Sequence, residues 1–343
     1  MKTFLQERLT GLPGQVVGFS KEGKAEAQYP RGGFMAQLEV TVIRGTASGA
    51  VTVTAFCSGQ EITGTIPAEK HSLTLELPIY GRWTVTATAE TGELLNGSRE
   101  VAVDAVRQYP VLLGAYETLG KNTPAVICSA CAAGLAQRYW KVGDGIDLSL
   151  STGETVTVEI YDFDHDTLTQ GGTAAITFGT RHLPIDKYCH HNLPGSSSVL
   201  NTKGWAESGV RTIVLPEILK SMPQEWREVI RPVKKLTSLG GQQEGTVTAV
   251  DDSLFLFSEE EVFGTAEHAA AGEGKLYSVF TDGSRRIKLT RNGAGGASSW
   301  VLRSPLTHHA KSSDKGKFYC SVDSRGTVQA EYSGTLLCFG FCV

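Results

Sequence analysis

The chain has 343 residues and a formal net charge of -4; charged residues make up 20% of it and aromatic residues 8%. So small a net charge gives no electrostatic reason to expect binding to nucleic acid or to an anionic membrane surface. No run of about 18 apolar residues occurs, so the sequence predicts no membrane insertion. The 39 glycines are typical of a turn-rich, largely β protein, long enough for two or three domains.

The N-terminal segment, residues 1–33, mixes polar residues with glycine, and we interpret it as an arm or attachment segment. It has no apolar core of the kind that a secretion signal needs, which favours a protein made in the cytoplasm. The seven cysteines are an odd number and are scattered along the chain. We therefore expect reduced, mostly buried thiols rather than a disulfide framework.

Residues 34–107 alternate between apolar and polar side chains, which predicts five or more β-strands. Turn-forming residues separate these strands, and Asn96-Gly97 is the strongest signal for a tight hairpin. Short alternating strands in this number predict an all-β sandwich of immunoglobulin type, as an architecture only, because the paired cysteines of antibody domains are missing. The predicted inward-facing positions fall in five runs: Leu38 to Val42, Val51 to Cys57, Leu73 to Leu77, Trp83 to Ala89 and Val101 to Ala105.

Residues 108–138 are predicted to form a linker and a helix. The helix begins at Pro124, which follows a capping hydroxyl and suits the first helical position. The pair Cys128 and Cys131 could indicate redox chemistry or half of a zinc site, but no second pair lies at a suitable spacing, so a packing role is favoured. The apolar stripe of this helix is Ile127, Cys131 and Leu135.

Residues 139–343 mix strands and short helices without a βαβ rhythm, which predicts an α+β domain. Strict alternation from Thr155 to Tyr161 indicates a strand, and helices are expected to start near Pro216 and Pro223. The run Ser258–Glu261 matches a helix capping box. The chain ends on Phe-Gly-Phe-Cys-Val with no polar tail, so we expect its last strand to lie within a sheet.

The stretch 298–343 alternates apolar anchors with almost wholly polar blocks, a pattern typical of short core strands that carry long surface loops. An ordinary β-rich domain end is the alternative interpretation. Arg303 lies between two apolar anchors. We expect it to pair with a buried carboxylate, Glu207 or Glu259, or with loop carbonyls, and so to fix the base of these loops.

The densest group of potential metal ligands is Asp162, Asp164, His165 and Asp166. These side chains could hold a hard cation such as calcium. On a strand, however, the three carboxylates share one face and the imidazole takes the other, and no glycine-punctuated calcium loop follows. A structural role is favoured, and metal binding is left as the alternative.

Two cysteine-containing segments raise the question of catalysis. Cys189-His190-His191 places a thiol beside two imidazoles, but adjacent residues of an extended chain point to opposite faces. Cys338 and Cys342 lie among aromatic residues, where a free cysteine behaves as a small hydrophobe. The sequence contains no serine elbow and no nucleotide-binding glycine motif, so no enzyme is predicted.

Ordered sequence blocks from Tyr139 to Val343 resemble C-terminal domains of unknown function in phage and prophage tail proteins of Firmicutes and other gut bacteria. Immunoglobulin-like modules often precede such a domain in tail proteins. One departure is Val301, where the family often has a second tryptophan. The blocks that carry the resemblance are Tyr139–Gly143, Tyr161–Asp166, Gly204–Ser208 with Arg211-Thr212, Val233–Thr237, Leu254–Glu259 with Val262–Gly264, Ala271–Gly274, Trp300–Pro305 and Phe339–Val343.

The family resembles the C-type-lectin fold, which is also the scaffold of variable proteins of diversity-generating retroelements. The resemblance therefore implies an all-β immunoglobulin-like sandwich followed by an α+β C-type-lectin-like domain, with a changeable polar surface near the C-terminus. Formylglycine-generating enzymes share that fold and use cysteines, but nothing else of their pattern is present here. The expected ligand-binding residues are Thr307, His308, His309, Lys311, Ser312, Ser313, Lys317, Tyr319, Asp323, Arg325, Gln329, Glu331 and Tyr332.

Taken together, the sequence and the resemblance predict a non-catalytic receptor-binding protein at the tail tip of a phage or prophage. It would be made in the cytoplasm of a bacterial host and assembled into the virion. Its partners would be a host cell-surface glycan or protein and other tail proteins, with a homo-oligomer, first a trimer, expected by resemblance to tail fibres. No cofactor is needed. The alternatives are a purely structural tail component and an enzyme that acts on surface glycans.

Overall fold

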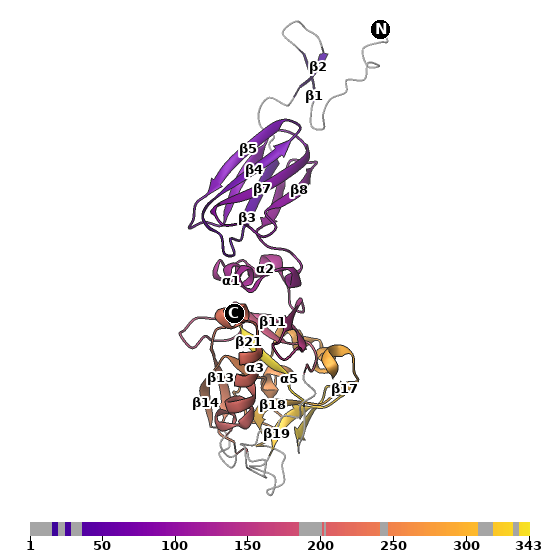
Figure 1. Ribbon diagram of the computed structural model, residues 1–343. Coiled ribbons are helices and arrows are strands. Elements are labelled where there is room, and N and C mark those ends of the chain that lie inside the picture. The colour runs from indigo at the N-terminus through magenta and orange to yellow at the C-terminus, as the bar shows by residue number, and fades with distance from the viewer. Residues whose placement is uncertain are drawn as a thin grey trace, which may run out of the picture. The chain divides into compact units, whose positions relative to one another are not determined.

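The computed structural model describes residues 16–19, 25–28, 36–184, 201, 204–240, 246–307, 318–331 and 336–343. The chain divides into two compact units: residues 1–117 with 125–133, and residues 118–124 with 134–343. Both units are rich in β-structure, and their strands form several separate sheets (Figure 1). Among the described helices, none has the length and apolar character required to cross a bilayer. Within the predicted arm, β1 (Val16–Phe19) and β2 (Ala25–Gln28) pair as an antiparallel hairpin.

The first unit contains two sheets whose apolar faces share one core. In the three-stranded sheet, β3 lies between β6 and β9, antiparallel to β6 and parallel to β9. The other sheet has the order β5-β4-β7-β8 and is antiparallel throughout. The bounds are β3 (Ala36–Val42), β4 (Ser48–Cys57), β5 (Gln60–Ile66), β6 (Ser72–Leu77), β7 (Gly81–Thr91), β8 (Ser98–Val103) and β9 (Gln108–Leu113).

The sequence alternation explains this core directly. Side chains on a strand point to opposite faces in turn, so every second residue of β3 and β4 is buried. Leu38 and Val53 are fully buried, and Trp83 fills the middle of the same cluster while its indole N–H donates to the Ile79 carbonyl at 3.2 Å. Burying one such aliphatic side chain contributes roughly 1.5–3 kcal/mol. Two facing sheets stabilised in this way form a two-layer arrangement, to which we refer as the sandwich.

The predicted boundary between sandwich and linker is wrong by one strand. Residues 108–113 form β9, which pairs with β3, so the sandwich extends past Arg107. Pro110 in the middle of this segment conceals the alternation of its neighbours. The predicted helix is present as α1 (Pro124–Ala132), but it ends before Leu135. Its two cysteines are half-buried.

One predicted turn also differs. Asn96-Gly97 does not form a two-residue hairpin, because β7 ends at Thr91 and β8 begins at Ser98. Asn96 has a positive φ of 51°, and its side-chain amide donates to the Ala115 carbonyl at 2.8 Å. The asparagine therefore anchors a longer connection rather than closing a tight one.

The second unit is built on a five-stranded antiparallel sheet with the order β10-β11-β12-β21-β15. The alternation from Thr155 to Tyr161 is confirmed as the main part of its longest strand. The strands are β10 (Gly145–Ser149), β11 (Thr155–Phe163), β12 (Ile176–Thr180), β15 (Leu254–Leu256) and β21 (Phe339–Cys342).

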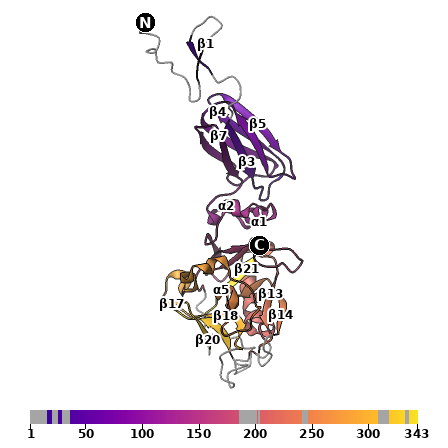
Figure 2. The same cartoon turned by 180° about the vertical axis from the view of Figure 1, so that it is seen from behind.

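Smaller sheets and short helices complete this unit. Pro216 and Pro223 lie at the starts of two helices, as predicted. In both views the sheet β18-β19-β20 lies on the opposite side of the unit from β11 and β21 (Figures 1 and 2). The strands are β13 (Val233–Ser238), β14 (Val247–Asp252), β16 (Lys288–Leu289), β17 (Ala297–Ser298), β18 (Trp300–Pro305), β19 (Tyr319–Val322) and β20 (Val328–Glu331), and the helices are α2 (Ala136–Tyr139), α3 (Leu215–Ser221), α4 (Gln224–Val229) and α5 (Glu259–Phe263).

The C-terminal strand lies inside the main sheet, between β12 and β15, as its apolar sequence predicted. The Phe341 ring stacks on Phe178 with ring centres 5.3 Å apart and meets Trp226 edge-on at 5.6 Å. Gly340 has no room for a side chain, because a Cβ would lie 2.7 Å from the Phe257 ring and 2.8 Å from the Phe178 carbonyl. The last residues of the chain thus complete the core of the unit.

Candidate functional site

Arg303 is the most extensively bonded residue of the strand that precedes segment 308–317. It lies on β18, all six residues of which are buried, and its own side chain has no exposed surface. The guanidinium donates to both carboxylate oxygens of Glu261 and to the backbone carbonyls of Leu236, Leu256 and Glu273. A planar fork of five N–H groups suits such a set of acceptors better than any other side chain. Arg303 therefore fastens β18 to α5, β13 and the segment at Glu273.

The predicted partner of Arg303 was wrong in identity. Neither Glu207 nor Glu259 pairs with it; the carboxylate is that of Glu261. The capping box is confirmed, because Ser258 Oγ accepts from the Glu261 backbone N–H while the Glu261 carboxylate accepts from the Ser258 N–H. A glutamate already assigned to a helix cap gave no signal of a second role, so sequence reasoning missed it.

A second buried cation extends this network toward the main sheet. Lys235 Nζ lies 2.7 Å from Asp166 Oδ1, 2.6 Å from Glu261 Oε1 and 2.9 Å from the Tyr277 hydroxyl. Burial alone raises the pKa of the Asp166 and Glu261 carboxyls, but the neighbouring cations more than offset it, so both pKa values lie below their ordinary range. The Asp166 and Glu261 carboxyls are thus held ionised in the interior, and with Arg303 and Lys235 they form the buried group that we call the ion network.

Glu259, the first residue of α5, connects this helix to the backbone at Thr307. It is buried, and its carboxylate accepts hydrogen bonds from the backbone N–H groups of residues 267, 268 and 269. The His268 carbonyl in turn accepts from the Thr307 N–H at 2.9 Å. A carboxylate that satisfies three consecutive donors fixes the loop that carries them. The backbone at Thr307, the last described residue before 308–317, is held by this chain of contacts.

Asn201 contacts the residues on both sides of segment 308–317. Its side-chain amide, fully buried, donates to the carbonyls of both Leu306 and Phe318. The Leu306 N–H donates to the Phe318 carbonyl at 2.9 Å, so the chain leaves and re-enters at one place. Gly240 has a φ of +70°, and a Cβ there would lie 1.9 Å from the Asn201 carbonyl oxygen. Described residues next to three segments therefore meet at Asn201, a position we call the loop base: Asn201 lies after 185–200, Gly240 precedes 241–245, and Leu306 and Phe318 lie on either side of 308–317.

The structure separates the thirteen predicted binding residues into three groups. Thr307 and Tyr319 are buried, so neither side chain can contact a partner, and both are removed from the candidate set. The Tyr319 hydroxyl donates to the Gly204 carbonyl at 2.9 Å, and burial raises the pKa of this phenol. An aromatic residue at the start of β19 serves the core rather than the surface. Outside the described residues lie His308, His309, Lys311, Ser312, Ser313, Lys317 and Tyr332.

The remaining residues do not share one surface with the loop base. Asp323 and Arg325 lie in the turn after β19, whereas Phe318 precedes that strand. Four extended residues separate the two ends by roughly 13 Å. The Asp323 carboxylate accepts from the N–H groups of residues 325 and 327 and pairs with the Arg325 side chain; although its limited burial acts the other way, these contacts lower its pKa to about 2. Asp323 shapes the turn, and only Arg325 of this pair is exposed.

The other two predicted binding residues lie on β20. Gln329 is half-buried, opposite Ser321 of β19. The backbone of Glu331 pairs with that of Tyr319, at the loop-base end of the strand. Of the predicted residues that remain candidates, Glu331 is therefore the described one whose strand position lies nearest to the residues that flank 308–317.

The acidic run after β11 is dispersed. Strand β11 ends at Phe163 and Asp164 has a positive φ of 50°, so the predicted alternation of the carboxylates is wrong. Asp162 accepts from the Ser278 N–H and hydroxyl, Asp164 from Gln137, and Asp166 belongs to the ion network. Within the described part of the chain, no three histidine, cysteine or acidic side chains come together as a metal site.

The C-terminal thiols lie deep in the core. Burial raises the pKa of Cys320 and Cys342, which keeps both thiols protonated. Cys338 Sγ accepts from the Thr180 hydroxyl at 3.2 Å. A protonated thiol without surface access is not a nucleophile. The run Cys189-His190-His191 lies outside the described residues.

Residues 183–336, somewhat less than half of the chain, match a family described as a domain of unknown function, DUF6273. The match contains the loop base and three of the four members of the ion network. It does not contain β10, β11, β12 or β21, so the folded unit is larger than the matched segment. No curated protein and no solved structure matches the chain.

Proposed function

We propose that the protein is a non-catalytic receptor-binding component of a phage or prophage tail, in which an immunoglobulin-like sandwich precedes a C-type-lectin-like recognition domain. The recognition face consists of the segments that depart from the loop base, above all 308–317. Its ligand is a glycan or protein on the host cell surface. Other tail proteins hold it in the virion as a homo-oligomer, and several copies per particle raise the avidity of individually weak contacts.

The convergence of segment ends at Asn201 is the observation that supports this proposal best. Recognition loops bind more tightly when a rigid scaffold limits the entropy lost on binding. Here the described residues that flank 308–317 are fixed by backbone hydrogen bonds, and the strand before them is held by Arg303. The segment itself is rich in histidine, lysine and serine, which provide planar, charged and adaptable hydrogen-bonding contacts.

We extend the proposed face to segment 185–200, which lies outside the described residues and carries Tyr188, His190 and His191 in its sequence. What supports this extension is Asn201, the residue that follows the segment, which donates to the Phe318 carbonyl at the loop base.

The proposal is tested by replacing His308, His309 and Lys311 together with alanine. Binding of the purified protein to intact cells of the strain that carries the gene, and to related strains, should weaken tenfold or more, roughly 1.4 kcal/mol. The melting temperature should change little, because surface substitutions usually alter stability by less than about 0.5 kcal/mol. A matched control replaces Lys141, Arg227 and Lys234, three exposed cations of the same unit, with alanine and should bind as the parent does.

Three results would contradict the proposal. Equal loss of binding in the control would reduce the effect to non-specific charge. Unfolding of the loop variant would assign the segment a structural role instead of recognition. Release of soluble sugar from cell envelopes by the parent protein would favour the enzyme alternative.

A further inference from the structure

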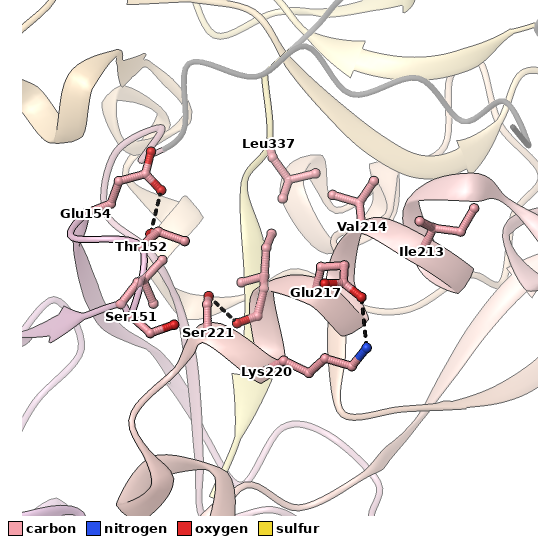
Figure 3. Close-up of a pocket in the computed structure, with 11 residues that line it drawn as sticks. Ser151, Thr152, Glu154, Ile213, Val214, Glu217, Lys220, Ser221 and Leu337 are labelled. Carbon is pink, nitrogen blue, oxygen red and sulfur yellow. Dashed lines mark hydrogen bonds and ion pairs between the residues drawn. The ribbon is translucent and has the colours of Figure 1, made fainter.

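A cavity in the second unit is lined by none of the residues that form the loop base. Its volume is about 560 Å³, within the usual range of small-molecule sites of roughly 300–1,000 Å³. Three separate segments form it: the turn between β10 and β11, helix α3 with the turn before it, and Leu337 just before β21 (Figure 3). Figure 3 shows Leu337 and Val214 on one side of the cavity and the Glu154 turn on another.

The cavity has an apolar floor and a polar rim. Leu150, Ile218 and Leu337 are buried side chains that form the floor, while Ile213 is 38% exposed at the edge. Ligand sites are usually concave and mostly apolar, with a few polar groups at positions that contact the ligand. A partner with an aliphatic body would remove this surface from water.

One wall of the cavity has an unusual backbone. Val210–Val214 forms a π-helical turn, in which the Leu215 N–H donates to the Val210 carbonyl five residues back. Such turns are rare in proteins overall. Where they do occur, they often lie at functional sites, because the extra residue widens the helix and redirects its side chains. Arg211 in this turn is fixed by Asp252, with 2.6 Å between Nε and Oδ1. The ion pair between Arg211 and Asp252 therefore fixes the turn that carries Ile213 and Val214.

The rim carries an excess negative charge. Lys220 and Glu217 pair with each other at 2.8 Å, which leaves their combined charge neutral. Glu154 is half-buried, and among the described residues its carboxylate contacts the Thr152 hydroxyl, 3.2 Å away, but no cation. Of the charged side chains that line the cavity, one carboxylate thus lacks a counter-ion.

We propose that this cavity binds an amphipathic organic cation, with its aliphatic chain over Leu150, Ile218 and Leu337 and its ammonium group beside Glu154. The apolar floor provides affinity through burial of the chain. The carboxylate without a counter-ion selects the head group, because it attracts an ammonium more strongly than a neutral hydroxyl and repels another carboxylate. This site is independent of the recognition face at the loop base.

The test compares three probes of equal chain length, n-octylammonium, n-octanol and n-octanoate, titrated into the full-length protein by calorimetry. The expected order of affinity is octylammonium, then octanol, then octanoate. Glu154→Gln should weaken octylammonium about fivefold, as expected for one partly exposed ion pair, and leave octanol unchanged. The control Glu225→Gln removes an exposed carboxylate of α4 that does not line the cavity and should change neither.

A second variant tests the location. Val214→Phe places a larger side chain at the half-buried wall and should abolish binding of octylammonium and octanol together. If this variant fails to fold, the order of affinities of the three probes and the effect of Glu154→Gln still test the proposal. Absence of binding by all three probes, equal affinity for all three, or an equal effect of Glu225→Gln would overturn the proposal.

Discussion

The two units bury their interiors by different physical means. The sandwich core consists of aliphatic side chains and Trp83 from long, regular strands, with each buried position set by a period of two. The core of the second unit combines aromatic rings with the buried ion network, whose members lie on short strands, a short helix and a loop. Hydrophobic burial is non-directional, whereas a buried ion pair is favourable only in one geometry. The difference predicts that the sandwich tolerates changes of packing better than the second unit, where the ion network specifies the position of the loop base.

The largest expected effect comes from breaking the ion network. Arg303→Ala removes the bidentate partner of the Glu261 carboxylate, which is then paired with Lys235 alone, and it removes the donor to three carbonyls in the interior. The cost should be about 4 kcal/mol, a fall of roughly 10 °C in the melting temperature of the second unit. Differential scanning calorimetry of the full chain should show the transition of the sandwich unchanged.

A matched double variant sharpens this result. Arg303→Met with Glu261→Met removes both charges, so it should cost less than Arg303→Ala alone, because both members of one ion pair leave the interior together and Lys235 keeps Asp166 as its partner. If the double variant loses binding to cells while it retains its stability, the role of the ion network is to position the loop base rather than to stabilise the unit. A loss below about 1 kcal/mol for Arg303→Ala would show that the pair contributes little.

The corresponding change in the sandwich is Leu38→Ala. It removes a fully buried aliphatic side chain and leaves a cavity, with an expected cost of about 3 kcal/mol. In calorimetry the transition of the first unit should fall while that of the second stays, and attachment to cells should be unchanged at low temperature. If both transitions fell together, the two units would unfold cooperatively and the comparison would fail.

The smallest effect concerns pH. Burial raises the pKa of Glu273 above its ordinary value, although Arg303 and hydrogen bonding from Ser304 and Ser238 act in the opposite direction. A raised folded-state pKa contributes stability that is fully present below the unfolded-state pKa and is lost as pH rises through the folded-state pKa. Glu273→Gln should therefore flatten the fall in stability of the second unit over that window. Glu225→Gln, on the exposed face of α4, should leave the pH profile as it is.

At low pH, stability is expected to change with pH in the opposite direction, because a different carboxyl titrates there. The pKa of Glu261 lies below its ordinary value, because its two cationic neighbours outweigh burial. Its contribution is present above the unfolded-state pKa and is lost as pH falls through the folded-state pKa. Stability measured in Glu273→Gln should keep this loss at low pH, so the same titration series separates the two carboxyls.

The sequence by itself determined the local features of this protein. The alternating strands of the sandwich, the capping box at Ser258, the helix at Pro124 and the apolar last strand all depend on residues within a few positions of one another, and all are confirmed. Periodicity and capping are short-range rules, so one sequence is sufficient to apply them.

Only the tertiary structure decided which distant residues meet. Pairing of β9 with β3, the choice of Glu261 for Arg303, the burial of Tyr319 and the convergence on Asn201 all join segments far apart in the chain. Residue type cannot tell a tyrosine that binds a ligand from one that donates to a buried carbonyl, because both need an aromatic ring with a hydroxyl. That distinction depends on which backbone approaches it, and only the packed sheets determine this.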